Sequence, residues 1–399
     1  MEPKLRLKGH RGDWISSKIG QIATFSKGSG YSKSDLCKNG NPIVLYGRMY
    51  TRYQSIIDDV DTFVVPKQNS VYSNGGEVII PGSGESPEDI SLAATIKNSG
   101  VILGGDLNIL KFDENINNPA FMAMAITYSP TRAQLSNYAQ GKTVVHLRNS
   151  EIAKGSICYP NINEQKDIVN YVSSIDTLIS SLTSRLAALN QMKAASLQAM
   201  FPQIGETVPK IRFKGFEEGW KKESLGKLFS ERIESNVDGE MLSVTINSGI
   251  IKAADNGRFD NSNSDKSKYK VVKVGDIAYN SMRMWQGASG CSQYEGIVSP
   301  AYTVVVPNEN VDSTFFAFLF KTTPMIHLFR LHSQGLTKDT WNLKYPAFSL
   351  IEVLYPESKQ EQKKIADYFT SLDKQIYLQS QRLEKLKQIK SACLDKMFV

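Results

Sequence analysis

The sequence predicts an α+β fold in which two blocks of mixed sheet and helix are joined by two long helices, paired as an antiparallel coiled coil with pseudo-twofold symmetry. Three observations predict it. The chain repeats itself at matching anchor segments, each repeat ends in a long amphipathic helix, and the remainder is rich in short strand-like runs. The expected boundaries are 1–155 and 206–352 for the blocks, and 156–205 and 353–399 for the helical segments.

The first anchor of the repeat opens each block. A short basic segment ending in glycine is followed by a tryptophan and then by an aliphatic–glycine pair, with the same spacings in both copies. A period of about 200 residues indicates two copies of one domain, because solenoid repeats are much shorter. The copies are residues 6–9, Trp14 and 19–20 in the first block, and residues 212–215, Trp220 and 225–226 in the second.

The second anchor closes each block and continues into the helical segments. Residues 165–201 align with residues 362–398 without a gap, and roughly 16 of the 37 positions are identical. A weaker match precedes it, where the Gln-Gly-x-Thr strings at 140–143 and 334–337 correspond. Between these anchors the blocks hardly resemble each other. The layout is therefore a variable block, a shared helix, a second variable block and a second shared helix.

The shared segments read as helices, because residues 168–200 contain no glycine or proline and their apolar residues recur every seven positions. A helix of about 35 residues is about 50 Å long and needs a partner along its length. The other copy is the expected partner, and an antiparallel pair would place the two blocks at opposite ends. The alternative is one helical core with two unrelated decorations. The predicted packing residues are Ile168, Ile175, Leu182, Leu189, Ile365, Leu372 and Leu386.

The two blocks contain strand-like runs such as 42–46, 78–81 and 301–306, and loops that mix arginine, aromatic and amide side chains. Arginine can hold guanine through two hydrogen bonds, amides can hold adenine likewise, and hydroxyls serve phosphates or bases. The alternative is that the aromatics are core residues and the arginines form surface pairs. The candidate DNA-binding residues are Tyr46, Arg48, Tyr50, Arg52 and Lys142 in the first block, and Asn280, Ser281, Arg283, Trp285, Gln286 and Lys338 in the second.

Composition agrees with a DNA-binding protein without proving it. The net charge is +7 and the isoelectric point is about 8.9, which permits a polyanionic partner. No apolar run is long enough to span a membrane, no signal peptide opens the chain, and the four cysteines are far apart. The expectation is a cytoplasmic protein without membrane contact, zinc site or disulfide framework.

Sequence signatures of catalysis are missing. The four histidines stand in no zinc-hydrolase or deaminase frame, and there is no nucleophile elbow or Walker loop. Residues 82–84 read as a turn, and no Asn/Asp-Pro-Pro-aromatic string of an amino-methyltransferase is present. We expect no catalytic, metal or cofactor site in this chain. A nuclease cluster assembled only in three dimensions stays open at this stage.

The layout resembles the specificity subunits of Type I restriction–modification enzymes across essentially the full chain. The resemblance rests on the two tryptophan anchors, on residues 160–165 and 356–362, and on Asp176, Leu189, Lys193 and Phe201 with their repeats. It implies that each block is a target-recognition domain reading one half of a split, asymmetric site on double-stranded DNA. It further implies that the helices set the gap between the halves and carry two modification subunits.

In such a complex the partners do the chemistry. Modification subunits would bind S-adenosylmethionine and methylate adenine, and restriction or translocase subunits would use ATP and magnesium. Two other classes remain as alternatives. A standalone DNA methyltransferase or nuclease would show activity as the isolated chain. A structural scaffold would bind no specific sequence even with its partners.

Overall fold

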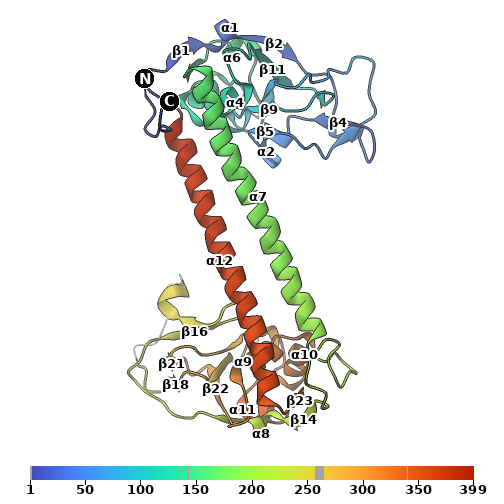
Figure 1. Cartoon of the computed structure of the whole chain (residues 1–399), viewed down its shortest axis with the longest axis vertical. Coiled ribbons are helices and arrows are strands. Elements are labelled where there is room, and N and C mark those ends of the chain that lie inside the picture. The colour runs from blue at the N-terminus through green and yellow to red at the C-terminus, as the bar shows by residue number, and fades with distance from the viewer. Residues whose placement is uncertain (1, 142, 257–264, 339) are drawn as a thin grey trace. The chain divides into compact units, whose positions relative to one another are not determined.

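The computed structural model describes residues 2–141, 143–256, 265–338 and 340–399. The chain forms two compact units: unit 1 comprises Met1–Thr183 with Arg382–Val399, and unit 2 comprises Ser184–Gln381 (Figure 1). Each unit contains one block together with parts of both long helices. The predicted α+β class is confirmed.

Unit 1 is built on a five-stranded sheet with the order β2-β11-β7-β9-β5. Its pairs are antiparallel except for β5 and β9, which run parallel. A smaller sheet has the order β10-β4-β6-β3. The bounds of these strands are β2 Ala23–Lys27, β11 Leu107–Phe112, β7 Val78–Pro81, β9 Ala94–Ile96, β5 Ile56–Ile57, β10 Ile102–Leu103, β4 Asn41–Val44, β6 Phe63–Val64 and β3 Leu36–Cys37.

Helix α4 (Pro119–Tyr128) packs against this sheet and is apolar on every side, as expected of a fully buried helix. Its N-cap is Asn118, whose side chain accepts a hydrogen bond from the Phe121 amide at 3.1 Å, and proline stands at its first position. The other helices of the block, α1 (Ile19–Ile22), α2 (Arg48–Thr51), α3 (Pro87–Ile90), α5 (Pro130–Tyr138) and α6 (Asn149–Ile152), are short.

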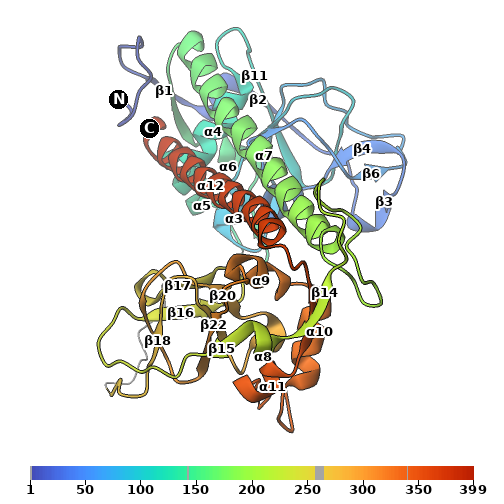
Figure 2. The same ribbon diagram turned by 60° about the horizontal axis from the view of Figure 1, so that its bottom comes forward.

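Unit 2 repeats this plan with a four-stranded sheet of order β15-β22-β19-β20. Two antiparallel pairs, β16 with β17 and β18 with β21, complete its strands. Figure 2 shows α10 and α11 on one side of the unit and strands β16 to β18 on the other. The bounds are β15 Phe229–Glu231, β22 Tyr302–Pro307, β19 Ile277–Asn280, β20 Ser289–Cys291, β16 Leu242–Thr245, β17 Gly249–Lys252, β18 Lys270–Val272, β21 Gly296–Val298, α8 Leu225–Leu228, α9 Ser313–Leu319, α10 Thr323–His332 and α11 Tyr345–Ser349.

Each block is closed by its first and last strands. In unit 1, β1 (Ile15–Lys18) pairs antiparallel with β13 (Ser156–Tyr159), and in unit 2, β14 (Lys221–Ser224) pairs with β23 (Glu352–Tyr355) in the same register. The repeated glycine after each opening strand has a steric reason. A Cβ at Gly20 would lie 3.0 Å from Ala153 Cβ, and one at Gly226 would lie 2.8 Å from Ser349 Cβ.

The anchors form equivalent buried polar contacts in the two units. The Arg6 guanidinium holds both carboxylate oxygens of the buried Glu164 at 2.8 Å, and Arg212 holds those of Glu361 at 2.6 and 2.8 Å. These hydrogen bonds raise the pKa of both arginines. Bidentate arginine–carboxylate pairs are geometrically demanding. They tie the entry segment of each block to the start of its helix.

The buried amides next to these carboxylates complete the scaffold. Gln165 accepts a hydrogen bond from the Asn118 amide at 2.7 Å and donates to the Pro160 carbonyl at 2.8 Å. Gln362 accepts from the Asp312 amide at 2.8 Å and donates to the Pro356 carbonyl at 2.9 Å. Each glutamine therefore joins the helix-capping residue of its block to the proline before the long helix.

The long helices are α7 (Ile162–Ala199) and α12 (Lys359–Met397). In unit 1 the first half of α7 lies beside the end of α12, where Lys390 and Asp176 form an ion pair at 2.5 Å. In unit 2 the end of α7 lies beside the first half of α12, where Lys193 and Asp373 pair at 2.5 Å. The helices therefore run antiparallel within each unit, and the two ion pairs occupy equivalent positions of the repeat.

Most of the residues predicted to pack between the two long helices are buried in the structure. Six of the seven are buried: Ile168, Ile175, Leu182, Leu189, Ile365 and Leu372. Leu386 is only partly buried, and Leu383 occupies the buried position instead. A straight α-helix drifts by about 20° per heptad relative to a strict seven-residue repeat, so the apolar stripe moves to a neighbouring position along the helix.

The end of each long helix completes the core of the unit where it arrives. Phe398 lies 5.6 Å from Phe121 in unit 1, and Phe201 lies 5.5 Å from Phe315 in unit 2, both measured between ring centroids. Backbone contacts follow the same rule. The Leu5 amide donates to the Lys396 carbonyl at 2.9 Å, and the Ile211 amide donates to the Ala199 carbonyl at 2.9 Å.

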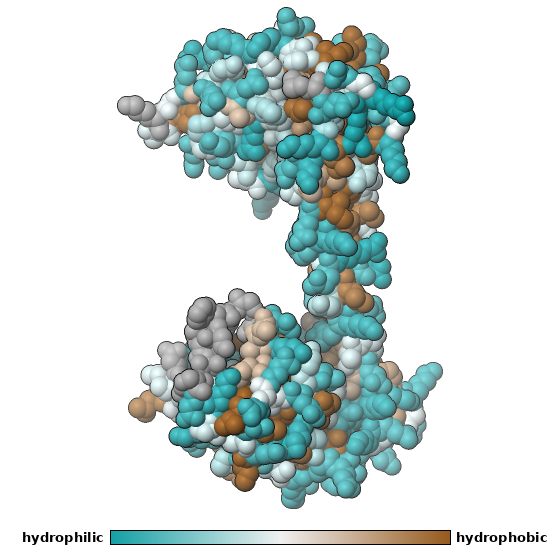
Figure 3. Space-filling view, turned by 90° about the vertical axis from the view of Figure 1, so that its left-hand side faces the viewer, coloured by the Kyte–Doolittle hydropathy of each residue, from teal (hydrophilic) through white to brown (hydrophobic). Residues whose placement is uncertain are grey.

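Apolar side chains also remain exposed on the long helices. Figure 3 shows apolar patches interrupting a largely hydrophilic surface along them. Among the described residues, no helix combines the length and the apolar character needed to cross a lipid bilayer. The exposed apolar residues of the helices are Tyr171, Leu178 and Ile389 in unit 1, and Met192, Tyr377 and Leu378 in unit 2.

Candidate nucleic-acid interface

The loop that follows β19 in unit 2 exposes several of its side chains to solvent. Met282, Arg283 and Gln286 point to solvent from this loop, which contains a short 3₁₀ turn over Met284–Gln286. The side chain of Asn280 accepts a hydrogen bond from the Met282 amide at 3.0 Å and shapes the start of the loop. Arg283 and the Gln286 amide are thus presented on one exposed turn, with the donor and acceptor groups that base edges require.

Ser281 was predicted as a DNA contact, and its environment favours a structural role instead. Its side chain is buried and shares a hydrogen bond of 2.8 Å with the Thr303 hydroxyl, while its carbonyl accepts from the Leu343 amide at 2.8 Å. The hydroxyl is consumed inside the domain, so it is not available to a base or phosphate. Ser281 positions the loop.

The turn over 334–342 lies against this loop. Trp285 from the loop and Trp341 from the turn form an edge-to-face pair with centroids 5.3 Å apart, and both are half-buried. The turn is closed by the pairing of Gln334 with Asn342, and its Lys338 is exposed. The structure therefore brings together candidates that lie more than fifty residues apart in the sequence. Trp341 was not predicted, because an isolated tryptophan carries no local signal.

Lys321, two residues after the end of α9, supports the loop after β19 through hydrogen bonds. Its ammonium donates to the Ile246 carbonyl at 2.8 Å and also to the Gly287 carbonyl at the end of the loop after β19. Burial lowers the pKa of Lys321 to about 8, with a further contribution from the nearby Lys193. Lys321 therefore connects the loop after β19 to the β16–β17 turn, close to the helix pair of unit 2.

In unit 1 the corresponding place in the fold is the segment after β7, whereas the candidates predicted for unit 1, Tyr46, Arg48, Tyr50 and Arg52, lie in a different segment. The Leu147 amide donates to the Gly82 carbonyl at 3.0 Å, just as Leu343 donates to Ser281 in unit 2. Strand β12 (Val145–His146) pairs with β8 (Ser83–Gly84) and docks the turn over 140–146 on this segment. Lys142, a predicted contact on that turn, lies outside the described residues.

The tyrosines predicted for unit 1 lie close to this segment. Tyr46 and Tyr50 form an edge-to-face pair with centroids 6.2 Å apart. Burial, followed by the charges of Tyr46, Asp89, Glu85 and Asp106, raises the pKa of Tyr50 to about 12. Tyr46 is exposed and Tyr50 is partly buried, so the aromatic pair is accessible to a partner.

Arg48 corrects another prediction. Its guanidinium is buried and donates to Asp61 at 2.6 Å, to Gln54 at 2.8 Å and to the Asp59 carbonyl at 2.8 Å. A guanidinium enclosed by three protein acceptors supports the loop rather than DNA. Arg52 is half-exposed and also pairs with Asp61, so it remains accessible to a partner.

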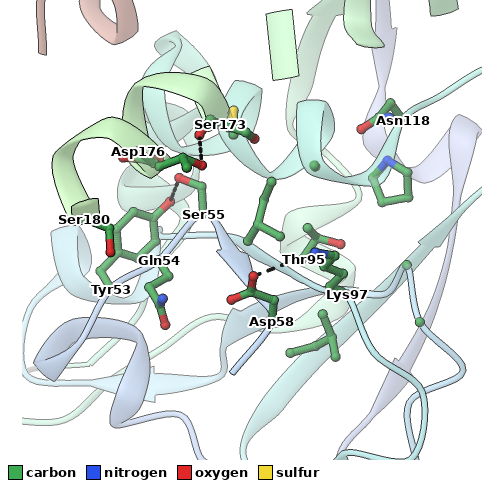
Figure 4. Close-up of a pocket in the computed structure, with 18 of the residues that line it drawn as sticks. Tyr53, Gln54, Ser55, Asp58, Thr95, Lys97, Asn118, Ser173, Asp176 and Ser180 are labelled. Atoms are coloured by element: carbon green, nitrogen blue, oxygen red, sulfur yellow. Dashed lines mark hydrogen bonds and ion pairs between the residues drawn. The ribbon is translucent and has the colours of Figure 1, made fainter. Parts of the chain in front are cut away.

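A polar groove of about 1290 Å³ lies between the edge of the unit 1 sheet and α7. Figure 4 shows Ser173, Asp176 and Ser180 of α7 across from Tyr53 and Thr95. Its lysines are engaged by carboxylates, Lys97 by Asp58 at 3.8 Å and Lys390 by Asp176 at 2.5 Å. Sequence reasoning gave no indication of this groove, because it forms between segments far apart in the chain.

The described part of the chain contains no group of three or more His, Cys, Asp or Glu side chains arranged to hold a metal ion. The surfaces at β7 and β19 instead expose donors, acceptors and aromatic faces at the ends of strands. Such an arrangement can recognise a ligand with planar, hydrogen-bonding edges. It gives no constellation of nucleophile, base and orienting group.

Comparison with known proteins gives a consistent result. The family model described as "Type I restriction modification DNA specificity domain" matches residues 11–191 and 218–388. The specificity subunit of the Type I restriction enzyme HindI from Haemophilus influenzae is 27% identical over 195 residues, which cover 45% of this chain and 41% of that protein. The alignment therefore spans less than half the length of this relative.

Among solved structures, a Type I restriction–modification S subunit from M. genitalium matches with a TM-score of 0.60 and 16% identity. The match covers 100% of this chain and 99% of that one. At this identity the likeness concerns the fold. It extends over both blocks and both long helices.

Proposed function

We propose, because the chain belongs to the Type I restriction–modification DNA specificity family, that each of its two units reads one half of a split DNA site. Specificity subunits of Type I systems select the site and are not themselves catalytic. In this proposal the half-sites are unrelated, since the two units present different side chains on the same scaffold.

The observation that carries the proposal is the repeated pairing of the β7 and β19 loops with the turns at 140–146 and 334–342. In both units a leucine amide joins the turn to the loop, through Leu147 and Gly82 or through Leu343 and Ser281. The join is the same, whereas the exposed side chains around it differ. Two surfaces that read different bases require the same backbone support and different exposed side chains, which is what the two units have.

The long helices are proposed to carry two modification subunits and to set the gap between the half-sites. Exposed apolar residues of α7 and α12, such as Leu178 and Tyr377, offer surface that a partner helix can cover. The partners would bind S-adenosylmethionine, and the restriction subunits would use ATP and magnesium. Double-stranded DNA would contact the reading surfaces of both units.

Methylome sequencing tests the proposal directly. A strain that expresses the chain with its modification subunit is compared with one lacking only this chain. We expect one split methyladenine motif in the first strain and its loss in the second. As a matched control, a chain with block 206–352 taken from another family member should change only one half of the motif. An unchanged methylome in all strains would favour a scaffold.

The gap-setting role has its own test. Insertion of about four residues into both α7 and α12, at the junction of the two units, adds about one helical turn of 5.4 Å. With about 3.4 Å of DNA axis per base pair, the accepted gap should lengthen by about one to two base pairs while both half-sites stay the same. An unchanged gap would contradict the helices as a ruler and leave base reading intact.

A further inference from the structure

Asp106 has an unusual backbone conformation. Its φ angle is +61°, and among the described residues it is the one non-glycine residue in the left-handed region. Most L-residues avoid this conformation because Cβ approaches the following carbonyl oxygen, whereas aspartate and asparagine tolerate it through local hydrogen bonds of their side chains. Asp106 is exposed and immediately precedes β11.

The surroundings of Asp106 hold it in place. The Gly82 amide donates to the Asp106 carbonyl at 2.6 Å, and the Ser83 hydroxyl donates to one oxygen of the Asp106 carboxylate. A Cβ at Gly82 would lie 2.4 Å from the other carboxylate oxygen, so only glycine leaves room there. The carboxylate is therefore fixed against the loop after β7 and not swinging freely in solvent.

Asp106 sits among the reading elements of unit 1. Ser83, its hydrogen-bond donor, pairs with His146 of the docked turn. Tyr50 of the aromatic pair packs against the core cluster that contains Leu107, the residue next to Asp106. Three segments distant in the sequence, around Tyr50, Ser83 and His146, thus converge near one carboxylate.

The charge of Asp106 is costly on a surface that faces DNA, unless a donor from the DNA meets it. No described lysine, arginine or histidine forms an ion pair with Asp106, and phosphates repel a carboxylate. Among the groups in the major groove, the exocyclic amino groups of cytosine and adenine are donors that a carboxylate can accept, whereas guanine and thymine place acceptors at that position. The adenine amino group lies beside the N7 acceptor, which repels a carboxylate, so cytosine is the favoured base. A fixed carboxylate therefore favours one base and penalises others.

The counterpart of Asp106 in unit 2 supports a reading role. The Ser281 amide donates to the Ala301 carbonyl at 3.3 Å, which is the same backbone link as that between Gly82 and Asp106. The link is retained while the side chain changes from carboxylate to methyl. The scaffold therefore does not require a carboxylate at this point.

We propose that Asp106 is a specificity-determining residue of unit 1, whose carboxylate accepts a hydrogen bond from the N4 amino group of a cytosine in the half-site that this unit reads. The inference rests on the proposed function. It assigns to one half-site a C·G pair and to one residue the discrimination at that pair.

The test uses the complete complex of this chain with its modification subunits, carrying Asp106→Asn. Asparagine tolerates the left-handed conformation and can still accept from Ser83, so the fold is retained while the charge is lost and a donor is gained. Methylation is measured on DNA panels with all four bases at each position of the wild-type motif. We expect the preference for cytosine at one position of one half-site to fall about tenfold to hundredfold, with the other half-site and the gap unchanged.

Asp113→Asn is the matched control, because Asp113 follows the far end of β11, is exposed and loses the same charge. It should leave base preference unchanged at every position. The inference is overturned if Asp106→Asn keeps the wild-type preferences, if it weakens all positions equally, or if neither half-site contains a C·G pair. A wild-type complex that methylates no split motif would instead refute the proposed function.

Discussion

Unit 1 and unit 2 agree in their buried polar contacts and differ in their exposed ones. Gln165 and Gln362 make the same two backbone hydrogen bonds, whereas Asp106 of unit 1 is replaced by Ala301 at the equivalent position of unit 2. An unpaired buried polar group destabilises any version of the fold, while an exposed side chain can change at little cost. The difference teaches that the fold constrains the scaffold and leaves the reading surface free to diverge.

The loops themselves are supported in different ways. In unit 1 the buried Asn108 side chain donates to the Pro81 carbonyl at 3.2 Å and to the Leu147 carbonyl at 2.8 Å. In unit 2 the corresponding support comes from the hydroxyls of Ser281 and Thr303 and from Lys321. The contacts that the two units share therefore end just beneath the loops.

The buried arginine–glutamate pairs that the two units share predict the largest effect on stability. Arg212→Ala leaves the buried Glu361 carboxylate without its bidentate partner, and Arg6→Ala does the same to Glu164. Each should lower the free energy of unfolding by about 3–5 kcal/mol, measured by chemical denaturation. Lys221→Ala, which removes an exposed ion pair with Glu357, is the control and should leave the free energy of unfolding nearly unchanged. Unequal losses for Arg6 and Arg212 would break the equivalence of the units.

Lys321 predicts a pH dependence that is specific to unit 2. Burial lowers the pKa of Lys321 from 10.5 to about 8, so between these values the unfolded chain binds a proton that the folded chain does not. The free energy of unfolding should therefore rise with pH from about 8 to 10.5, by on the order of 1–3 kcal/mol. Lys321→Met removes this titration while keeping the apolar stem. A wild-type minus variant difference that is flat or falls over this range would contradict the prediction.

The reading surface of unit 2 predicts a smaller effect, confined to binding. Trp341→Ala removes one ring of the Trp285–Trp341 pair and should weaken binding of the assembled complex by about 1–3 kcal/mol if bases stack on it. Competition binding with DNA altered in one half-site at a time should assign the loss to a single half. Trp341→Phe should recover part of it. Equal weakening at both halves would indicate a general loss of structure.

Much of the fold was predictable from the sequence. The repeat is found by aligning the chain with itself, and the long helices are found from the spacing of apolar residues. The antiparallel pairing followed from the need to pass through the second block between the helices. Leu386 shows the limit of that reasoning, since a strict heptad ignores the drift that makes Leu383 the buried residue.

The site was less predictable. Arg48 and Ser281 have the right chemistry for DNA, yet their side chains are consumed by Asp61 and Thr303, partners that only the folded chain brings near. Trp341 and Asp106 were missed for the converse reason. The role of a single tryptophan or aspartate depends on the segments that fold against it, and the spacing of residues in the sequence does not reveal those segments.

The join between the end of a long helix and an entry segment is made twice. Ile211 meets Ala199 within one continuous stretch of chain, and Leu5 meets Lys396 from regions far apart in the sequence. A gene encoding one block and one helix would thus produce a protein that finds its missing half in a second copy of itself. Duplication and fusion of such a gene would keep both joins, and the exposed loops of the two copies would then be free to change independently.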